Sequence, residues 1–546
     1  MRQFTPYLFL LLAASFLYSC KSAKLSDAEE KQRIGEYFEA AAIYRKVYTK
    51  TPPAKRDLRG YIAFRMAECN RLINNTPRAT SAYMNALRYK YPDSIVNLRL
   101  GQMYQKSGRY GEAVKYYNDY LLAEPGSVLA FNGVTGCEEA VKWKQSPTRY
   151  TVKRMDKFNS RRSEFSPMLY GEKYDQLYFA STRAPKGAGK DKEETNSAIT
   201  GQRNNDLFLV KQDENGAWLA PVELEDEVNT EFDEGTPSFS KDGNTMYYTY
   251  CAQDPEGPRT SEIYISSRSS AKWGKGTRAN IVKDSVTALG HPSISPDGKY
   301  LYFVSDAVGG YGGKDLFRAR VVGSDFGSME NLGPDINTPG DEMFPYVRDS
   351  VTLYFASDGH PGMGGLDIFK ATLDSTGKWN VENMKAPINS SGDDFGITFA
   401  GKGQNLDTGA KVVHTGENTS SYINTRSISK DGGISTFRSS VTIGKNAKHS
   451  KAAVSCQSLM LDDISRSDTI PAMDIRTKDA DVGHEAKIGK ISDDAVFYLM
   501  SRGISEEDAR AMIVSGFADN VSKELPLEYA VEMNNLIRLE MKGSIG

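Results

Sequence analysis

Cysteine residues are the first side chains in this chain that could do chemistry, because thiolates bind metals and act as nucleophiles. No two of the five cysteines form a CxxC pair, so the spacing supports neither a zinc knuckle nor a thioredoxin-like motif. No Ser-His-Asp arrangement, glycine-rich phosphate loop or paired acid and base singles itself out. We therefore expect a protein that is not an enzyme, and rank a periplasmic enzyme or sugar-binding propeller last. The cysteines are Cys20, Cys69, Cys137, Cys251 and Cys456.

Amides and carboxylates recur together in the middle of the chain. They are Asn229 with Asp233-Glu234, Asn337 with Asp341-Glu342, and Asn389 with Asp393-Asp394. Because a functional site is usually built once, the repetition favours side chains that satisfy backbone donors in recurrent turns. The alternative is a rim of ligands for a cation or a small molecule.

The elements that position these residues repeat about every fifty residues, which is typical of propeller blades. The acidic residue that opens the last strand of each unit is Asp206, Glu262, Asp315 and then Asp367. Each unit holds about four short strands rich in aromatic residues. A fifth unit begins at Asp393 and stops short. Residues 150–403 therefore predict an all-β propeller of about five blades, the last one incomplete.

Small and aromatic residues recur with a different period in residues 24–145. Ala79 and Ala113 are 34 residues apart (113 − 79), as are Tyr83 and Tyr117 (117 − 83). This is the tetratricopeptide period, which predicts an α-solenoid whose curved surface commonly grips a partner protein. The alternative is an ordinary helical bundle whose spacing coincides.

The N-terminus carries the only membrane signal of the sequence. Leu8 to Leu17 is an apolar run that follows one positive charge and is too short to span a bilayer comfortably, which indicates a signal peptide over residues 1–20. Its ending at Cys20 resembles a bacterial lipobox, so Cys20 is a candidate for lipidation. The alternative is plain secretion, with Cys20 incidental.

The order of the modules in residues 1–403 resembles that of PorE-type lipoproteins of the type IX secretion apparatus. The propeller repeat is similar to the WD-like repeats of TolB-like proteins. The resemblance implies an envelope interaction lipoprotein at the periplasmic face of the outer membrane, held there by the Cys20 lipid. It implies protein partners for the solenoid and the propeller, and no cofactor.

The pattern changes near Gln404. Residues 405–546 show short β-branched runs with polar turns, which fit a β-helix-like stack. From Ser492 the pattern becomes helical. Ser505 caps the second helix, with acids in its first turn, and Leu525 opens a final one.

This last region resembles the C-terminal part of SufB, the scaffold of the SUF iron–sulfur cluster assembly system. The residues that carry the resemblance are 455–459, 465–469, 482–486 and 497–507. In that family the counterparts of Cys456, His484 and Glu485 belong to the cluster-assembly site, and the terminal helices dock the SufC ATPase. The resemblance implies a transient iron–sulfur cluster. From the residues alone, Cys456 could equally be a small core residue, and His484 could simply satisfy a turn.

Two hypotheses follow for the whole chain. The first is a non-enzymatic envelope lipoprotein fused to a fragment of a SUF scaffold. The second is a cytoplasmic cluster-assembly scaffold component of the SufB/SufD family that carries a protein-interaction extension at its N-terminus. A net charge of −2 gives no argument for nucleic acid as a partner of either.

Overall fold

The computed structural model divides the chain into two compact units, Met1–Thr398 and Phe399–Gly546. It describes residues 23–522 apart from 149, 172–173, 185–195, 226, 252–259, 270–271, 284–285, 375, 400–404, 431–432 and 463–464. The predicted signal peptide, Cys20 and the helix expected from Leu525 lie outside the described residues. No helix of the described part is long and apolar enough to cross a membrane.

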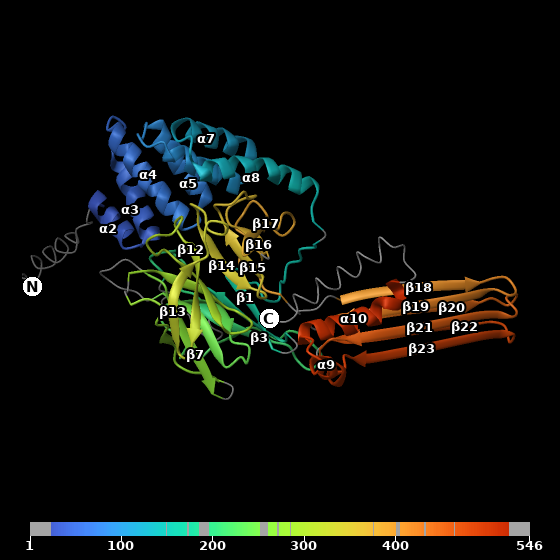
Figure 1. The fold of residues 1–546 in the computed structure, drawn as a ribbon. Helices are drawn as coiled ribbons and strands as arrows, with labels where there is room; N and C mark the ends of the chain where they lie inside the picture. The colour runs from blue at the N-terminus through green and yellow to red at the C-terminus, as the bar shows by residue number, and fades with distance from the viewer. Residues whose placement is uncertain are drawn as a thin grey trace, which may run out of the picture. The chain divides into compact units, whose positions relative to one another are not determined.

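The first unit begins with a run of antiparallel helices (Figure 1). Tyr117 shows why they pack closely: its ring is fully buried and lies where a Cβ at Gly101 or Gly133 would be, at 2.6 and 2.5 Å. Only glycine leaves room there. The structure confirms the helices, while their assignment as tetratricopeptide repeats stays a prediction. The helices are α2 (Leu25–Arg33), α3 (Tyr37–Lys50), α4 (Arg56–Leu72), α5 (Thr76–Arg88), α6 (Ile95–Lys106), α7 (Tyr110–Ala123) and α8 (Val128–Gln145).

Four antiparallel sheets follow the helices and confirm a propeller-like arrangement. Each of them is one blade. The first holds β1 (Glu164–Tyr170), β2 (Gln176–Ser181), β3 (Asp206–Lys211) and β4 (Val222–Glu223). The second holds β5 (Asp233–Phe239), β6 (Thr245–Cys251), β7 (Glu262–Ser269), β8 (Lys272–Trp273) and β9 (Thr277–Arg278). The third holds β10 (Leu289–Ile294), β11 (Tyr300–Ser305), β12 (Asp315–Val322) and β13 (Asp325–Asn331). The fourth holds β14 (Glu342–Val347), β15 (Thr352–Ser357), β16 (Asp367–Leu373) and β17 (Trp379–Asn383).

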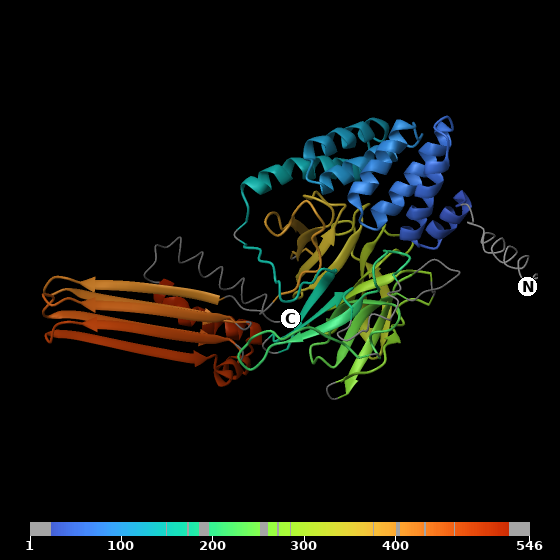
Figure 2. The same cartoon turned by 180° about the vertical axis from the view of Figure 1, so that it is seen from behind.

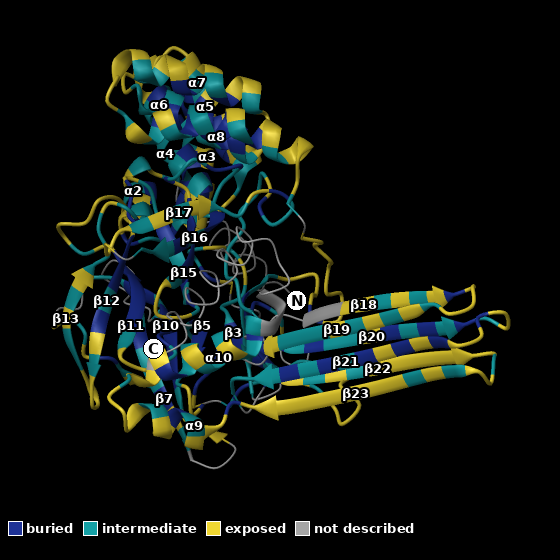
Figure 3. Cartoon of the chain, turned by 45° about the vertical axis from the view of Figure 1, so that its right-hand side comes forward, coloured by how far each residue is buried: buried dark blue, intermediate teal, exposed yellow. Residues whose placement is uncertain are grey.

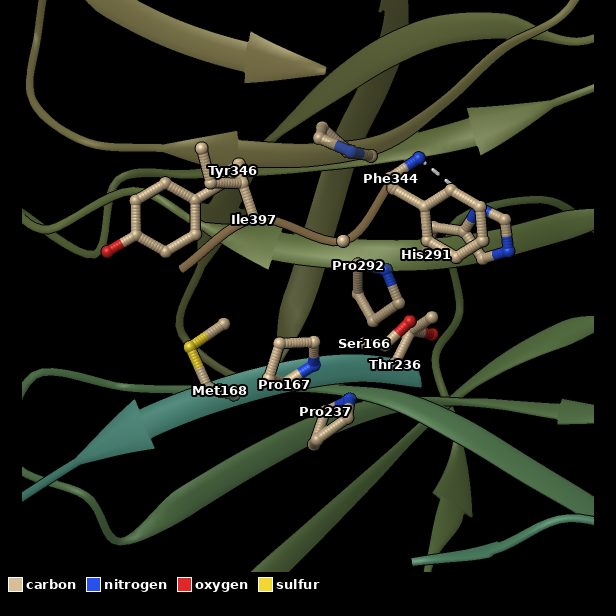
Figure 4. A pocket seen from close by; sticks show the side chains of 12 residues that line it. Ser166, Pro167, Met168, Thr236, Pro237, His291, Pro292, Phe344, Tyr346 and Ile397 are labelled. Carbon is tan, nitrogen blue, oxygen red and sulfur yellow. Dashed lines mark hydrogen bonds between the residues drawn. The ribbon is translucent and has the colours of Figure 1, made fainter. Parts of the chain in front are cut away.

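The number of blades corrects the expectation of about five, because residues 393–399 form no strand in the described structure. They still occupy a fifth position around a cavity of about 30 Å³ (Figure 4). One residue from each of the five repeats lines it with a positive φ: Ser166, Thr236, His291, Phe344 and Gly396. The fifth repeat therefore contributes a segment that lines the cavity but forms no sheet. The strands that would pair with this segment are missing from the sequence pattern.

The second unit is a stack of parallel strands in two layers, which confirms the predicted β-helix-like fold (Figures 1 and 2). Successive strands alternate between the two layers, so each turn of the stack contributes one strand to each sheet. One sheet holds β18 (Asn405–His414), β20 (Ile434–Ile443) and β22 (Arg466–Ile475). The other holds β19 (Ser420–Ser429), β21 (Ser450–Met460) and β23 (Ala480–Lys490). Two helices follow, α9 (Asp493–Met500) and α10 (Glu506–Ser522).

The core of this stack lies between its two sheets and comes from alternate residues of each strand. Along β21, the side chains of Ala452, Val454 and Cys456 are buried, while Lys451 and Ala453 between them are exposed. Strands β22 and β23 are mostly exposed on both faces, as the yellow ribbon of Figure 3 shows for β23. Among the described residues the last turn thus exposes inward-facing positions that the earlier turns bury.

Candidate functional site

The register of the second sheet decides which side chains meet. Strand β23 runs parallel to β21, with His484 opposite Val454 and Glu485 opposite Ser455. Because neighbouring residues of a strand point to opposite faces, His484 shares the inward face with Val454 and Cys456. Glu485 shares the outward face with Ser455. The alternation therefore separates two residues that are adjacent in the sequence.

Cys456 and His484 form a thiol–imidazole pair. The Sγ of Cys456 lies 3.7 Å from Nε2 of His484, and the thiol is buried, with 2% of the residue exposed. Burial raises the pKa of the Cys456 thiol, and a hydrogen bond with Thr469 opposes that rise. His484 itself is exposed, and β23 is the edge strand of its sheet within the described structure. The pair thus joins a sheltered sulfur to the imidazole of an exposed residue.

Glu485, the third residue of the predicted site, does not join the pair. Its carboxylate lies 2.8 Å from Nζ of Lys487, which projects from the same outward face two residues along the strand. The hydrogen bond with this ammonium group lowers the pKa of the exposed carboxyl. Its geometry is that of an ion pair on the outer surface.

Thr469 is a residue of the site that the sequence analysis did not single out. It lies on β22 opposite Phe437, an inward position of β20, so its hydroxyl comes from the facing sheet. Close to it, Ser458 accepts hydrogen bonds from Ser427 at 2.8 Å and from Ser467 at 2.7 Å. The alternation of buried and polar positions in residues 465–469 could have identified Thr469 as part of the site. That inference also requires knowing which strand faces Thr469.

The pair offers an iron–sulfur unit two ligand atoms of different kinds, a sulfur and a nitrogen. Thiolate sulfur and imidazole nitrogen are both common iron ligands, whereas a neutral thiol must first lose its proton. The imidazole next to the sulfur can accept that proton. The described residues hold no group of three or more His, Cys, Asp or Glu side chains placed to bind one metal ion. The pair can therefore hold cluster components while leaving iron coordination positions open.

The other cysteines of the described part are free thiols, of which Cys69 and Cys137 are buried and Cys251 is half-buried. Burial raises the pKa of Cys69, Cys137 and Cys251 to about 12 in each case. Thiols that remain protonated at neutral pH are poor ligands and nucleophiles. Within the described structure, the thiol–imidazole contact is made by Cys456.

The recurring amides of the propeller do structural work, as their repetition predicted. Asn229 accepts a hydrogen bond from the backbone N–H of Leu207 at 2.8 Å and donates one to the carbonyl of the same residue at 3.0 Å. Asn337 makes the same pair of bonds with Leu316, and Asn389 with Ile368. Each amide thereby fastens the third strand of one blade.

The recurring acids accept hydrogen bonds within the same turns. Glu342 accepts one from the Thr338 backbone N–H and one from its hydroxyl, both at 2.7 Å, and one from Ser357 at 2.6 Å. Glu234 repeats the arrangement with Thr230, and Asp394 with Ser390. The blades thus use these acidic side chains to satisfy donors within the turns, as their repetition predicted.

A model of the SUF system iron–sulfur cluster assembly proteins, the SufBD core domain, matches residues 374–517. An iron–sulfur cluster assembly SufBD family protein of Staphylococcus saprophyticus is 52% identical over 157 residues, which are 29% of this chain and 34% of that protein. A SufBD family protein of Mycobacterium leprae is 48% identical over the same length, 29% of this chain and 18% of that protein. The chain thus spans about a third or less of the curated relatives it matches.

Among solved structures, a thermostable family-43 glycoside hydrolase aligns with 44% of this chain and 77% of its own, at 15% identity and a TM-score of 0.30. A score this low does not establish a common fold. What the comparisons do establish is that residues 374–517, which include Cys456 and His484, match the SufBD core domain.

Proposed function

We propose that this chain is a non-enzymatic component of iron–sulfur cluster assembly, a scaffold of the SufBD type whose N-terminal helices and blades form a protein-interaction extension. Most of the family match, residues 374–517, lies on the second unit, and it favours this second sequence hypothesis over an envelope lipoprotein. The observation that carries the proposal is the 3.7 Å contact between Cys456 Sγ and His484 Nε2.

The geometry suits a cluster that is held briefly and passed on. A buried thiol protects the sulfur from solvent, and the exposed imidazole gives access from one side. Because two ligands leave iron coordination incomplete, an acceptor protein can supply the remaining ligands and draw the cluster away. A resident cluster normally has a complete set of protein ligands. The role of Glu485, expected from the resemblance, has no support from its place on the outer face.

The terminal helices offer the surface on which we propose that a SufC-like ATPase docks. Phe497, Tyr498 and Met500 on α9 and Met512 on α10 are large apolar side chains that stand exposed, Phe497 by 72%. Exposed apolar clusters of this kind mark protein contacts. Phe497→Asp should abolish co-purification of the ATPase, whereas Glu506→Ala on α10 should not. Retention of the ATPase by Phe497→Asp would contradict the docking surface.

We place the scaffold in the cytoplasm, since a thiol that serves as a ligand needs a reducing compartment. The four cysteines of the described part are all free, in keeping with that compartment. Labelling of Cys20 by palmitate in cells would instead support the envelope lipoprotein.

Anaerobic reconstitution of the full chain with ferrous iron and sulfide tests the proposal. We expect visible absorbance of an iron–sulfur cluster in the wild type and its loss in Cys456→Ser. Cys137→Ser is the matched control, because that thiol is equally buried, whereas the imidazole contact of the described residues is made by Cys456. A cluster that forms equally in Cys456→Ser would contradict the proposal.

A further inference from the structure

A groove of about 820 Å³ runs between helices α3, α4 and α5 in the first unit. Its floor is apolar and includes Ala41, Met66 and Ala82. The groove has the volume of a peptide-sized or ligand-sized site. Nothing in the cluster chemistry of the second unit uses it.

The charged side chains that line the groove are all positive. Arg45, Lys46 and Lys50 of α3 and Arg78 of α5 line it with exposed cationic side chains, and its lining includes no Asp or Glu. The neighbouring acids are engaged elsewhere: Glu39 binds Lys31 at 3.0 Å, and Glu68 binds Arg71 at 2.8 Å. Four positive charges over an apolar floor favour a partner that brings negative charge and apolar side chains together.

We propose that this groove binds an acidic protein segment, with its carboxylates on Arg45, Lys46, Lys50 and Arg78 and its apolar side chains on the floor. Asn85 lines the same groove; its amide nitrogen donates to the Ser81 carbonyl at 3.0 Å, and its oxygen can accept from an extended backbone. The proposal rests on the proposed role of the helices as an interaction extension and specifies the chemistry of the partner.

The aromatic rings of the groove favour a peptide over a nucleic acid. Single-stranded nucleic acids bind cationic grooves that also offer free aromatic faces for stacking. The Tyr48 ring is already covered by the Arg59 guanidinium, 4.0 Å from its centroid. Phe38 packs against Gly201, where its ring atoms lie 2.5 Å from the position of a Cβ. Each ring therefore already has a partner within the protein.

Fluorescence anisotropy on the full chain tests the proposal, with a labelled Glu-rich peptide that carries a central Leu-Phe pair as the probe. We expect micromolar binding that weakens as salt screens the charges, and at least about tenfold weaker binding by the Arg45→Glu, Arg78→Glu double variant. The Lys55→Glu, Lys115→Glu double variant is the matched control, because both lysines are exposed and neither lines the groove.

Each other outcome would overturn the proposal. These are equal binding by both double variants, equal binding of the same peptide with Lys in place of Glu, and tighter binding of an oligothymidylate of the same length. Circular dichroism of both double variants verifies that the helices are retained. The assay contains no iron or sulfide, so its failure leaves the cluster-assembly role untouched, and failure of reconstitution leaves this groove untouched.

Discussion

The blades of the first unit and the parallel stack of the second use buried polar groups in opposite ways. In the blades, the same amide is used three times, at Asn229, Asn337 and Asn389, and each copy binds one backbone N–H and one carbonyl. In the stack, Cys456 and His484 meet once, and their contact holds no backbone in place. Repetition thus marks side chains that keep the fold together, while the single pair is free for chemistry.

The largest loss of stability caused by a substitution should come from removing one of the repeated amides. Asn337→Ala leaves the buried N–H of Leu316 without its partner and removes one of two donors to the Leu316 carbonyl, which the Leu332 N–H also binds. The loss should lower the free energy of unfolding by about 2–4 kcal/mol. Urea unfolding measures the change. The control is Asn118→Ala on the exposed face of α7, which should leave the free energy nearly unchanged. Equal effects of the two substitutions would break the distinction between repeated and isolated polar groups.

Close packing in the helical part gives the next largest effect. Gly133→Ala should cost about 1–3 kcal/mol, because the new Cβ would lie 2.5 Å from the buried Tyr117 ring. Gly111→Ala in α7 meets no atom within 4 Å and should instead stabilise the helix by up to about 1 kcal/mol. Thermal unfolding of both variants checks the opposite signs. A neutral Gly133→Ala would show that the helices do not stack as described.

The acids of the blades should make stability depend on pH. Burial raises the pKa of Glu342 to about 8, against 4.5 as its ordinary value, so the folded chain retains a proton that the unfolded chain releases. This contribution is complete below about pH 4.5 and is lost as the pH rises to about 8, by up to about 1.4 kcal/mol per pH unit.

Glu342→Gln should therefore flatten the fall in unfolding free energy between pH 5 and 8. Glu382→Gln is the control, since that side chain stands exposed on β17. Urea titrations across this pH range measure both slopes. Parallel slopes for wild type and Glu342→Gln would mean that Glu342 is already ionised in the folded protein.

The smallest effect concerns the reactivity of the single pair. His484→Gln should slow the alkylation of Cys456 by iodoacetamide several-fold, because the imidazole can accept the thiol proton. Glu485→Gln should leave the rate unchanged, as Glu485 projects from the other face and pairs with Lys487. Mass spectrometry of the peptide that contains Cys456 gives both rates. A slower reaction in Glu485→Gln would restore Glu485 to the site.

Patterns that repeat in the sequence predicted most of the fold. The period that links Asp206 to Asp367 indicated blades, and the structure confirms them as four complete sheets. The fifth position escaped the pattern, because residues 393–399 fill it without a strand partner. The site was harder to predict: alternation along β23 separates His484 from Glu485, but only the register with β21 shows that His484 is the one that faces Cys456. Register between strands arises from tertiary packing, and residue spacing alone does not encode it.

Transfer of a cluster to an acceptor protein tests the central claim most directly. The full chain is reconstituted anaerobically and freed of excess iron and sulfide. It is then mixed with an apo-ferredoxin while circular dichroism follows the ferredoxin signal. We predict transfer by the wild type and by Glu485→Gln, and none by Cys456→Ser. A cluster that the wild type binds but does not release would show a resident cofactor, and transfer by Cys456→Ser would contradict the proposed site.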